Sequence, residues 1–244
     1  MAGFFNSIAE WFINLFANFR DRFIQNFVAE DRWRYITDGL GVTLKVTIAA
    51  VVLGIVLGFV IAIVRSTHDM TGKLKVANFI CRVYLTVIRG TPVVVQLLII
   101  YFVIFASVNI DKVVVAIIAF GINSGAYVAE IVRSGIMSID KGQFEAGRSL
   151  GFNYAQTMIF IIIPQAFKNI FPALGNEFIV LLKETSVSGY IAMQDLTKGG
   201  DIIRSRTYDA FMPLIAVALI YLVLVMLLEF VFNKMERKMR NSDH

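Results

Sequence analysis

The sequence predicts an all-α membrane protein with about five transmembrane helices. Of its 244 residues, 57% are hydrophobic and 17% are charged, and the mean hydropathy is +0.71. The apolar residues gather in long runs that are separated by short basic connectors. A soluble domain of this size could not bury so much apolar surface, whereas lipid can cover it. We therefore expect one membrane domain, covering residues 39–233.

Five segments are apolar enough to cross a bilayer, which takes roughly 20 residues of helix. They are Val46–Val64, Val83–Ile110, Val113–Ala129, Ile159–Leu182 and Ala210–Leu228. Arg89 interrupts the second segment near its start. Two prolines and the charged residues Lys168 and Glu177 break the fourth, so that hydropathy alone marks it only weakly.

The first 38 residues have a different pattern. Large apolar side chains recur at steps of three or four between Phe4 and Val28, and polar residues fill the opposite face. Such a segment, residues 1–38, is expected to form an amphipathic helix in the interface plane and to contact membrane lipid. A helix packed on the protein's own spans is the alternative. The segment lacks the continuous apolar run and the cleavage site of a signal peptide.

The basic residues predict the orientation, because Lys and Arg in short loops resist translocation. They cluster after the first, third and fifth spans, at Arg65, Lys73, Lys75, Arg82, Arg133, Lys141, Arg148, Lys234, Arg237, Lys238 and Arg240. With five spans, all three clusters fall on one side, which is expected to be the cytoplasm. Residues 234–244 then form a basic cytoplasmic tail, and the N-terminus lies outside.

Several function classes are excluded or unsupported. The net charge is +5, but the Lys and Arg residues lie between the apolar runs and do not form one basic stripe. Nucleic acid is therefore not an expected partner. Cys81 is the single cysteine, and His68 and His244 are too far apart in the chain to indicate a metal site. The chain has no phosphate-binding loop and no catalytic arrangement, which indicates that it is not an enzyme.

The segment from about 138 to 165 has strong local signals. Asp140 and Gln143 resemble a capping pair that opens a helix, Gly151 suits a left-handed end, and Asn153 can cap the next helix. We expect a helix, a sharp turn and a second helix that project into the cytoplasm. The apolar residues that this unit would expose for a docking partner are Phe144, Leu150 and Phe152. A plain amphipathic connector on the bilayer surface is the alternative.

Four blocks of residues resemble a known family. Glu145-Ala146-Gly147, Gly151 and Ile161-Ile162-Ile163-Pro164 resemble the EAA loop of ABC importer permeases, with Gly147 in place of Ala and Ile163 in place of Leu. The blocks Arg89-Gly90-Thr91-Pro92 with Gln96, Asn123-Ser124-Gly125-Ala126-Tyr127 with Glu130 and Arg133, and Pro172 to Glu177 with Lys183 to Ser186 are similar to the polar amino-acid branch of these permeases. The resemblance covers about residues 39–232.

This resemblance implies a type I importer permease in a bacterial cytoplasmic membrane. Such a permease works by alternating access as a dimer, either with a second copy of itself or with a related permease. A separate ABC subunit would bind ATP and Mg, so this chain needs no cofactor of its own. The residues implied in coupling to that ATPase are Glu145, Ala146, Gly147, Leu150, Gly151 and Phe152. An extracytoplasmic solute-binding protein would dock on the connection of residues 186–209.

The candidate substrate residues are two carboxylates and two neutral polar groups. Glu177 and Glu184 lie two helical turns apart and therefore on one face. In the resembled family, acidic residues at these positions can line the substrate site, where they would pair with an ammonium group. This favours a basic amino acid, although Thr86 stands where relatives often carry an acid. Thr91 and Asn123 complete the set, and Thr91 has the alternative role of stabilising a proline kink.

Two rival interpretations remain open at this stage. Glu177 could be paired with Lys168 or Lys183 and have no part in binding. A self-sufficient secondary transporter or channel would use Glu177 to bind an ion or a proton, and it would need no cytoplasmic docking turn.

Overall fold

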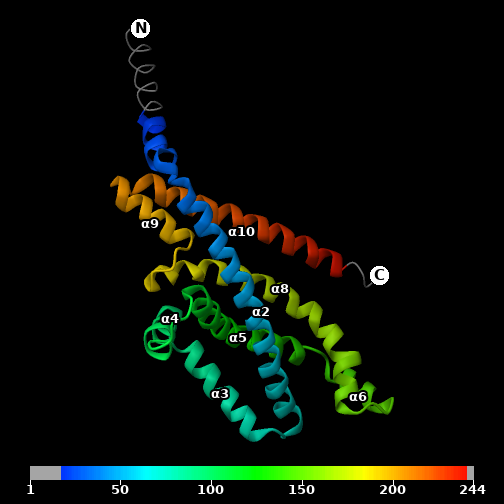
Figure 1. Cartoon of the computed structure of the whole chain (residues 1–244). Coiled ribbons are helices and arrows are strands. Elements are labelled where there is room, and N and C mark those ends of the chain that lie inside the picture. The colour runs from blue at the N-terminus through cyan, green and yellow to red at the C-terminus, as the bar shows by residue number, and fades with distance from the viewer. Residues whose placement is uncertain (1–17, 241–244) are drawn as a thin grey trace, which may run out of the picture.

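The structure, a computed structural model, describes residues 18–240, and all regular elements in that part of the chain are helical. Residues 18–23 are helical, and the elements that follow are η1 (Ile24–Val28), η2 (Ala29–Asp31), α2 (Trp33–Thr71), α3 (Lys75–Arg89), α4 (Val93–Ile99), η3 (Ile100–Ile104), α5 (Lys112–Met137), α6 (Lys141–Ser149), α7 (Tyr154–Thr157), η4 (Met158–Ile162), α8 (Ile163–Glu184), η5 (Thr185–Ile191), α9 (Leu196–Thr207) and α10 (Phe211–Arg240). Elements α6 and α9 lie at opposite ends of the bundle (Figure 1). The prediction of an all-α fold is confirmed.

Within the described residues, four helical stretches are long and apolar enough to cross a membrane. They are Trp33–Thr71, Lys112–Met137, Tyr154–Ile191 and Phe211–Met239. Helices α3 and α4 with η3 form a fifth candidate, which is bent by 106° between Arg89 and Val93. The predicted count of five therefore corresponds to this bent pair crossing as one span. The weakly marked fourth span is helical throughout, and Pro172 lies inside α8.

Helix α2 contains 39 residues and packs along α5. Small residues allow this close approach, because a Cβ atom at Gly58 would lie 2.5 Å from Cγ1 of Val128. One at Gly54 would lie 2.9 Å from Cβ of Ser124. The two helices thus meet nearly backbone to backbone, as small residues permit in membrane helices.

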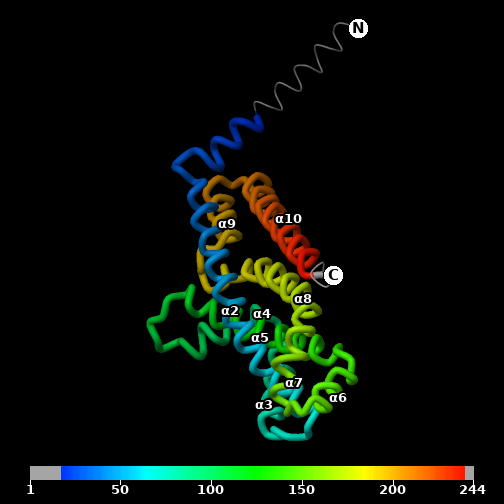
Figure 2. The backbone as a smooth tube through the Cα atoms, turned by 90° about the vertical axis from the view of Figure 1, so that its right-hand side faces the viewer, coloured from blue at the N-terminus to red at the C-terminus, as the bar shows by residue number. Residues whose placement is uncertain are grey.

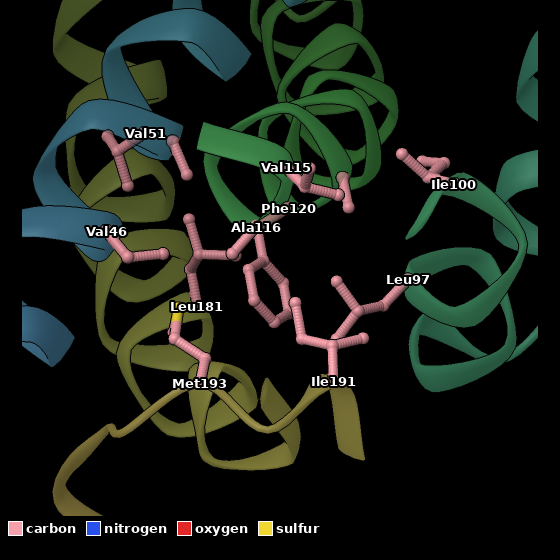
Figure 3. Packing of buried hydrophobic residues seen from close by; sticks show 12 residues of the cluster. Val46, Val51, Leu97, Ile100, Val115, Ala116, Phe120, Leu181, Ile191 and Met193 are labelled. Atoms are coloured by element: carbon pink, nitrogen blue, oxygen red, sulfur yellow. The ribbon is translucent and has the colours of Figure 1, made fainter. Parts of the chain in front are cut away.

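A central apolar cluster joins this pair to the other helices. Phe120 of α5 is fully buried between α2, α4, α8 and the turn η5 (Figure 3). The labelled neighbours in this cluster are Val46, Val51, Leu97, Ile100, Val115, Ala116, Leu181, Ile191 and Met193. Because these side chains come from α2, α4, η3, α5, α8, η5 and the residues just after η5, the cluster fixes α8 and the bent pair relative to α5.

Helix α10 packs mainly on α8 and α9 (Figure 2). Phe232 lies over Gly175, where a Cβ atom would come within 2.9 Å of the ring. The rings of Phe171 and Phe178 flank it, with centroids 6.2 and 5.9 Å away. This contact occupies one face of α8 and leaves the opposite face free to line a site.

The described end of the N-terminal segment packs on the protein's own helices, as the alternative interpretation predicts. Arg22 forms two hydrogen bonds to the Asp209 carboxylate, at 2.7 and 3.1 Å. The amide of Asn26, which is fully buried, donates to the same carboxylate and accepts from Thr207. Burial raises the pKa of Asp209, but these hydrogen bonds outweigh it and hold the pKa below its ordinary value. Phe4 to Ala17 lie outside the described residues.

Gly58→Ala should destabilise the α2–α5 contact. The added Cβ would overlap Val128 and the backbone nitrogen of Ala129, and overpacking of this kind costs about 1–3 kcal/mol. Thermal unfolding in detergent would measure the effect as a lower Tm. The matched control is Gly41→Ala in the same helix, where a Cβ meets nothing within 4 Å and Tm should be unchanged or higher. Equal Tm values for the two variants would contradict the close packing.

Candidate functional site

A cavity of about 770 Å³ lies between α3, α5 and α8. Its lining is Arg89, Tyr127, Glu130, Ile131, Ser134, Gly135, Ser138, Asn169, Ala173, Asn176, Glu177, Val180 and Glu184. A second cavity of about 510 Å³ shares Arg89, Tyr127 and Glu130 with it and adds Arg65 and Arg82. Ionisable groups of both signs therefore line two adjacent cavities among apolar helices.

The two predicted carboxylates line the first cavity together. Glu177 is only 9% exposed and accepts a hydrogen bond of 2.9 Å from the hydroxyl of Ser124 on α5. Glu184 is half-buried at the end of α8. Their seven-residue spacing does place both on one face of α8, opposite the face that packs on Phe232. The partner Ser124 was not predicted from the sequence.

Glu130 joins three arginines from three helices. Its carboxylate lies 2.6 Å from Arg133 of α5, 3.2 Å from Arg65 of α2 and 3.6 Å from Arg89 of α3. Arg133 also reaches Asp69 of α2 at 3.4 Å. Three guanidinium groups thus share two carboxylates, which leaves one positive charge in excess in this cluster.

Glu130 belongs to one of the family blocks in the sequence, but its role could not be assigned from the sequence alone. The sequence did contain a sign of such a role, because Glu130 directly follows the third apolar run and an ionised side chain near lipid has a high free-energy cost unless it is paired. Arg89 extends from the same cluster into both cavities, and its guanidinium lies over the Tyr127 ring at 5.7 Å.

The other two predicted substrate residues lie elsewhere. Thr91 and Asn123 are not part of the first cavity's lining. Instead, both bond to Gln96 at the bend between α3 and α4, at 2.9 Å in each case. Thr91 also donates to the Val87 carbonyl at 2.8 Å, as expected for a threonine that stabilises a proline kink. The four predicted residues therefore form two pairs. Glu177 and Glu184 line the first cavity, and Thr91 and Asn123 lie outside it at the bend.

The segment between α5 and α8 has the predicted helix–turn–helix form. Asp140 caps α6 by accepting from the Gly142 amide at 2.7 Å, and Gly151 has a φ of +82°. Asn153 forms a capping box with Gln156 at the start of α7. A Cβ at Gly147 would lie 2.7 Å from Cγ2 of Thr157, which explains why glycine fits here.

The three apolar residues expected to be exposed on this unit differ from one another. Leu150 is 72% exposed. Phe144 is half-buried, because it packs on the cluster that contains Met158 and Ile162. Phe152 is also half-buried and lies near Phe160, with ring centroids 6.3 Å apart. Both phenylalanines are thus partly covered by the protein itself, and of the three residues only Leu150 is largely exposed.

Comparison with known proteins identifies the family. Residues 50–241 match the family described as binding-protein-dependent transport system inner membrane component. The chain belongs to this family. It is therefore a multi-pass transport component of a membrane and not an enzyme, and the resemblance seen in the sequence is confirmed.

Individual relatives agree with this assignment. The chain is 39% identical to the arginine transport system permease protein ArtQ of Bacillus subtilis, over 86% of this chain and 94% of that protein. It is 42% identical to a putative glutamine transport system permease protein GlnP of Rickettsia typhi, over 84% and 93%. A crystal structure of an amino acid ABC transporter with histidines has 45% identity and a TM-score of 0.76, over 84% and 94%.

Glu130→Gln should destabilise the protein more than Asp69→Asn does. Glu130 contacts three arginines and Asp69 contacts one, and losing the anionic partner of a partly buried charge costs about 1–3 kcal/mol. Thermal unfolding of the two purified variants in one detergent gives the comparison. A larger loss of Tm for Asp69→Asn would contradict the central place of Glu130 in the cluster.

Proposed function

We propose that this chain is the permease subunit of an ATP-driven importer of a polar amino acid. The observation that carries the proposal is the cavity in which Glu177 and Glu184 face the same space as Arg89. The names of the relatives, which include arginine and glutamine transport permeases, support this substrate class.

The charges of the cavity suit a zwitterion. The excess positive charge beside Glu130 would be neutralised by the α-carboxylate of the substrate at Arg89, the arginine of the cluster that reaches the first cavity. Either carboxylate on α8 can accept from the α-ammonium group. Because two carboxylates are available for one ammonium, the second could pair with a cationic side chain, which favours a basic amino acid over a neutral one.

Energy is proposed to come from a separate ABC subunit, which would bind ATP and Mg. The coupling residues are those of the EAA loop: Glu145, Ala146, Gly147, Leu150, Gly151 and Phe152. The exposed side chain of Leu150 and the rigid caps at Asp140 and Asn153 support a docking role, because an apolar residue held out on a well-formed turn calls for a partner.

The remaining partners follow from the proposed orientation, with the EAA loop and the C-terminus in the cytoplasm and the N-terminus outside. Elements η5 and α9 then lie on the outer side, where a solute-binding protein would dock. A second permease, identical or related, would complete the translocation pathway, which would open alternately to the two sides. The exposed apolar faces of α3 and α10 are available to this partner and to lipid.

Glu177→Gln and Glu184→Gln should each weaken substrate binding. Removing one charge-assisted contact is expected to raise Kd about 10- to 100-fold. Binding of labelled L-arginine and L-glutamine to the purified transporter should be measured without its binding protein, which would otherwise select the substrate by itself. The control is Glu229→Gln on the exposed side of α10, which should bind like the wild type. Unchanged affinity and selectivity in both α8 variants would reject the site.

Gly151→Asp should separate the permease from its ATPase. Its φ of +82° is unfavourable for any residue with a side chain, so that the turn of the EAA loop would shift. Copurification in mild detergent and substrate-stimulated ATP hydrolysis should both fall several-fold. The control is Gly72→Asp, which has a similar φ of +69° in the turn after α2. Loss of the ATPase in both variants, or in neither, would contradict the coupling assignment.

A further inference from the structure

The bend between α3 and α4 leaves backbone carbonyls without their usual helical donors. Proline has no N–H, so Pro92 cannot supply the bond that the Ile88 carbonyl would accept in a continuous helix. Gly90, Thr91 and Pro92 separate the two helices at this point. A carbonyl freed inside a membrane protein must find another donor, because an unsatisfied polar group costs several kcal/mol in lipid.

Gln96 supplies that donor. Its amide nitrogen lies 2.7 Å from the Ile88 carbonyl oxygen, 3.0 Å from that of Thr91 and 2.9 Å from the Thr91 hydroxyl. Its amide oxygen accepts from Asn123 of α5 at 2.9 Å. Gln96 is 8% exposed and Asn123 is 3% exposed, so water does not compete with these bonds. Only a carboxamide offers two donor hydrogens and an acceptor at this reach.

The Gln96 clamp, meaning these bonds to Ile88, Thr91 and Asn123, encloses Arg89. Ile88 precedes Arg89 and Thr91 follows it by two residues, so the clamp holds the backbone on both sides of this arginine. Arg89 is the residue that reaches from the Glu130 cluster into the cavity. Where the bend is fixed relative to α5, the backbone from which the Arg89 side chain extends is fixed as well.

The neighbouring residue of α5 holds the group of opposite charge, the Glu177 carboxylate. Asn123 bonds to the clamp, and the next residue, Ser124, donates to Glu177. Two adjacent side chains of one helix therefore set the positions of the cationic and the anionic parts of the cavity. Their separation is defined by a rigid helical element rather than by a loop.

We propose that Gln96 is a positioning residue for substrate recognition. It acts through Arg89, which it holds at the place where the substrate carboxylate binds, and Thr91 and Asn123 are its partners rather than substrate ligands. The inference rests on the proposed function of the cavity. It gives the bend a role in holding Arg89 for the substrate, which a purely structural kink would not have.

The test measures discrimination for the α-carboxylate. Binding of labelled L-arginine and of agmatine, the same molecule without its carboxylate, is compared on the purified transporter without its binding protein. Arg89→Gln should abolish most of the preference for L-arginine. Gln96→Glu keeps the shape but loses the donor hydrogens, and it should reduce the preference about tenfold while agmatine binding stays close to the wild-type value.

A double-variant cycle distinguishes positioning from general damage. Because Gln96 acts through Arg89, the double variant Arg89→Gln with Gln96→Glu should be no worse than Arg89→Gln alone. Thr91→Val, which removes one hydroxyl, is the milder second variant if Gln96→Glu fails to fold, and it should lower the preference in the same direction. Gln25→Glu, at an exposed position, is the matched control.

The possible failures are separable. A full preference in Arg89→Gln would overturn the carboxylate site and, with it, the role of Gln96. A loss of preference in Arg89→Gln but not in Gln96→Glu or Thr91→Val would overturn the positioning role alone. Additive losses in the double variant would show that Gln96 acts independently of Arg89 and would also overturn it.

Discussion

The close approach of α2 and α5 is the contact on which the other features depend. Gly54 has no side chain where it meets Ser124, so the serine fits between α2 and α8 and its hydroxyl reaches Glu177. One turn further along, Gly58 makes room for Val128. A bulky residue at either glycine would separate the helices and move Ser124 away from the carboxylate. Small residues in α2 are thus needed for the hydrogen bond between Ser124 and Glu177, although α2 itself does not line the first cavity.

Pairing of charges is the second constraint. Ionisable side chains in a membrane domain need partners, and here most of those partners come from other helices. Glu130 connects α2, α3 and α5 through three arginines, while Glu177 connects α8 to α5. These groups therefore stabilise the packing and also set the charges that face the cavity.

Local features of this fold could be predicted from the sequence, because they depend on neighbouring residues. The apolar runs gave the spans, and the caps at Asp140, Gly151 and Asn153 gave the unit formed by α6 and α7. The seven-residue spacing placed Glu177 and Glu184 on one face. In each case a helical period or a turn preference was sufficient.

Features that join distant segments could not be predicted in this way. Of the partners of Glu130, only Arg133 is a neighbour at helical spacing, whereas Arg65 and Arg89 come from other helices and no periodicity links them to Glu130. Thr91 and Asn123 are polar residues in family blocks, which suggested ligand contact, but their bonds go to Gln96. The distinction between a ligand group and a support for the backbone requires the three-dimensional arrangement of the bend and α5.

The uninterrupted helical path from Tyr154 to Ile191 has a mechanical consequence. It begins just after the turn that carries Leu150 and continues through Glu177 to Glu184, so that the proposed coupling turn and the proposed substrate carboxylates are joined by one continuous helix. The π-helical turn Met158–Ile162 and Pro172 are its compliant points, because each weakens the regular hydrogen-bond ladder. Under the proposed function, a displacement of the exposed turn would move the two carboxylates through a tilt or a twist of this helix. A series of side-chain rearrangements between the two sites would not be needed.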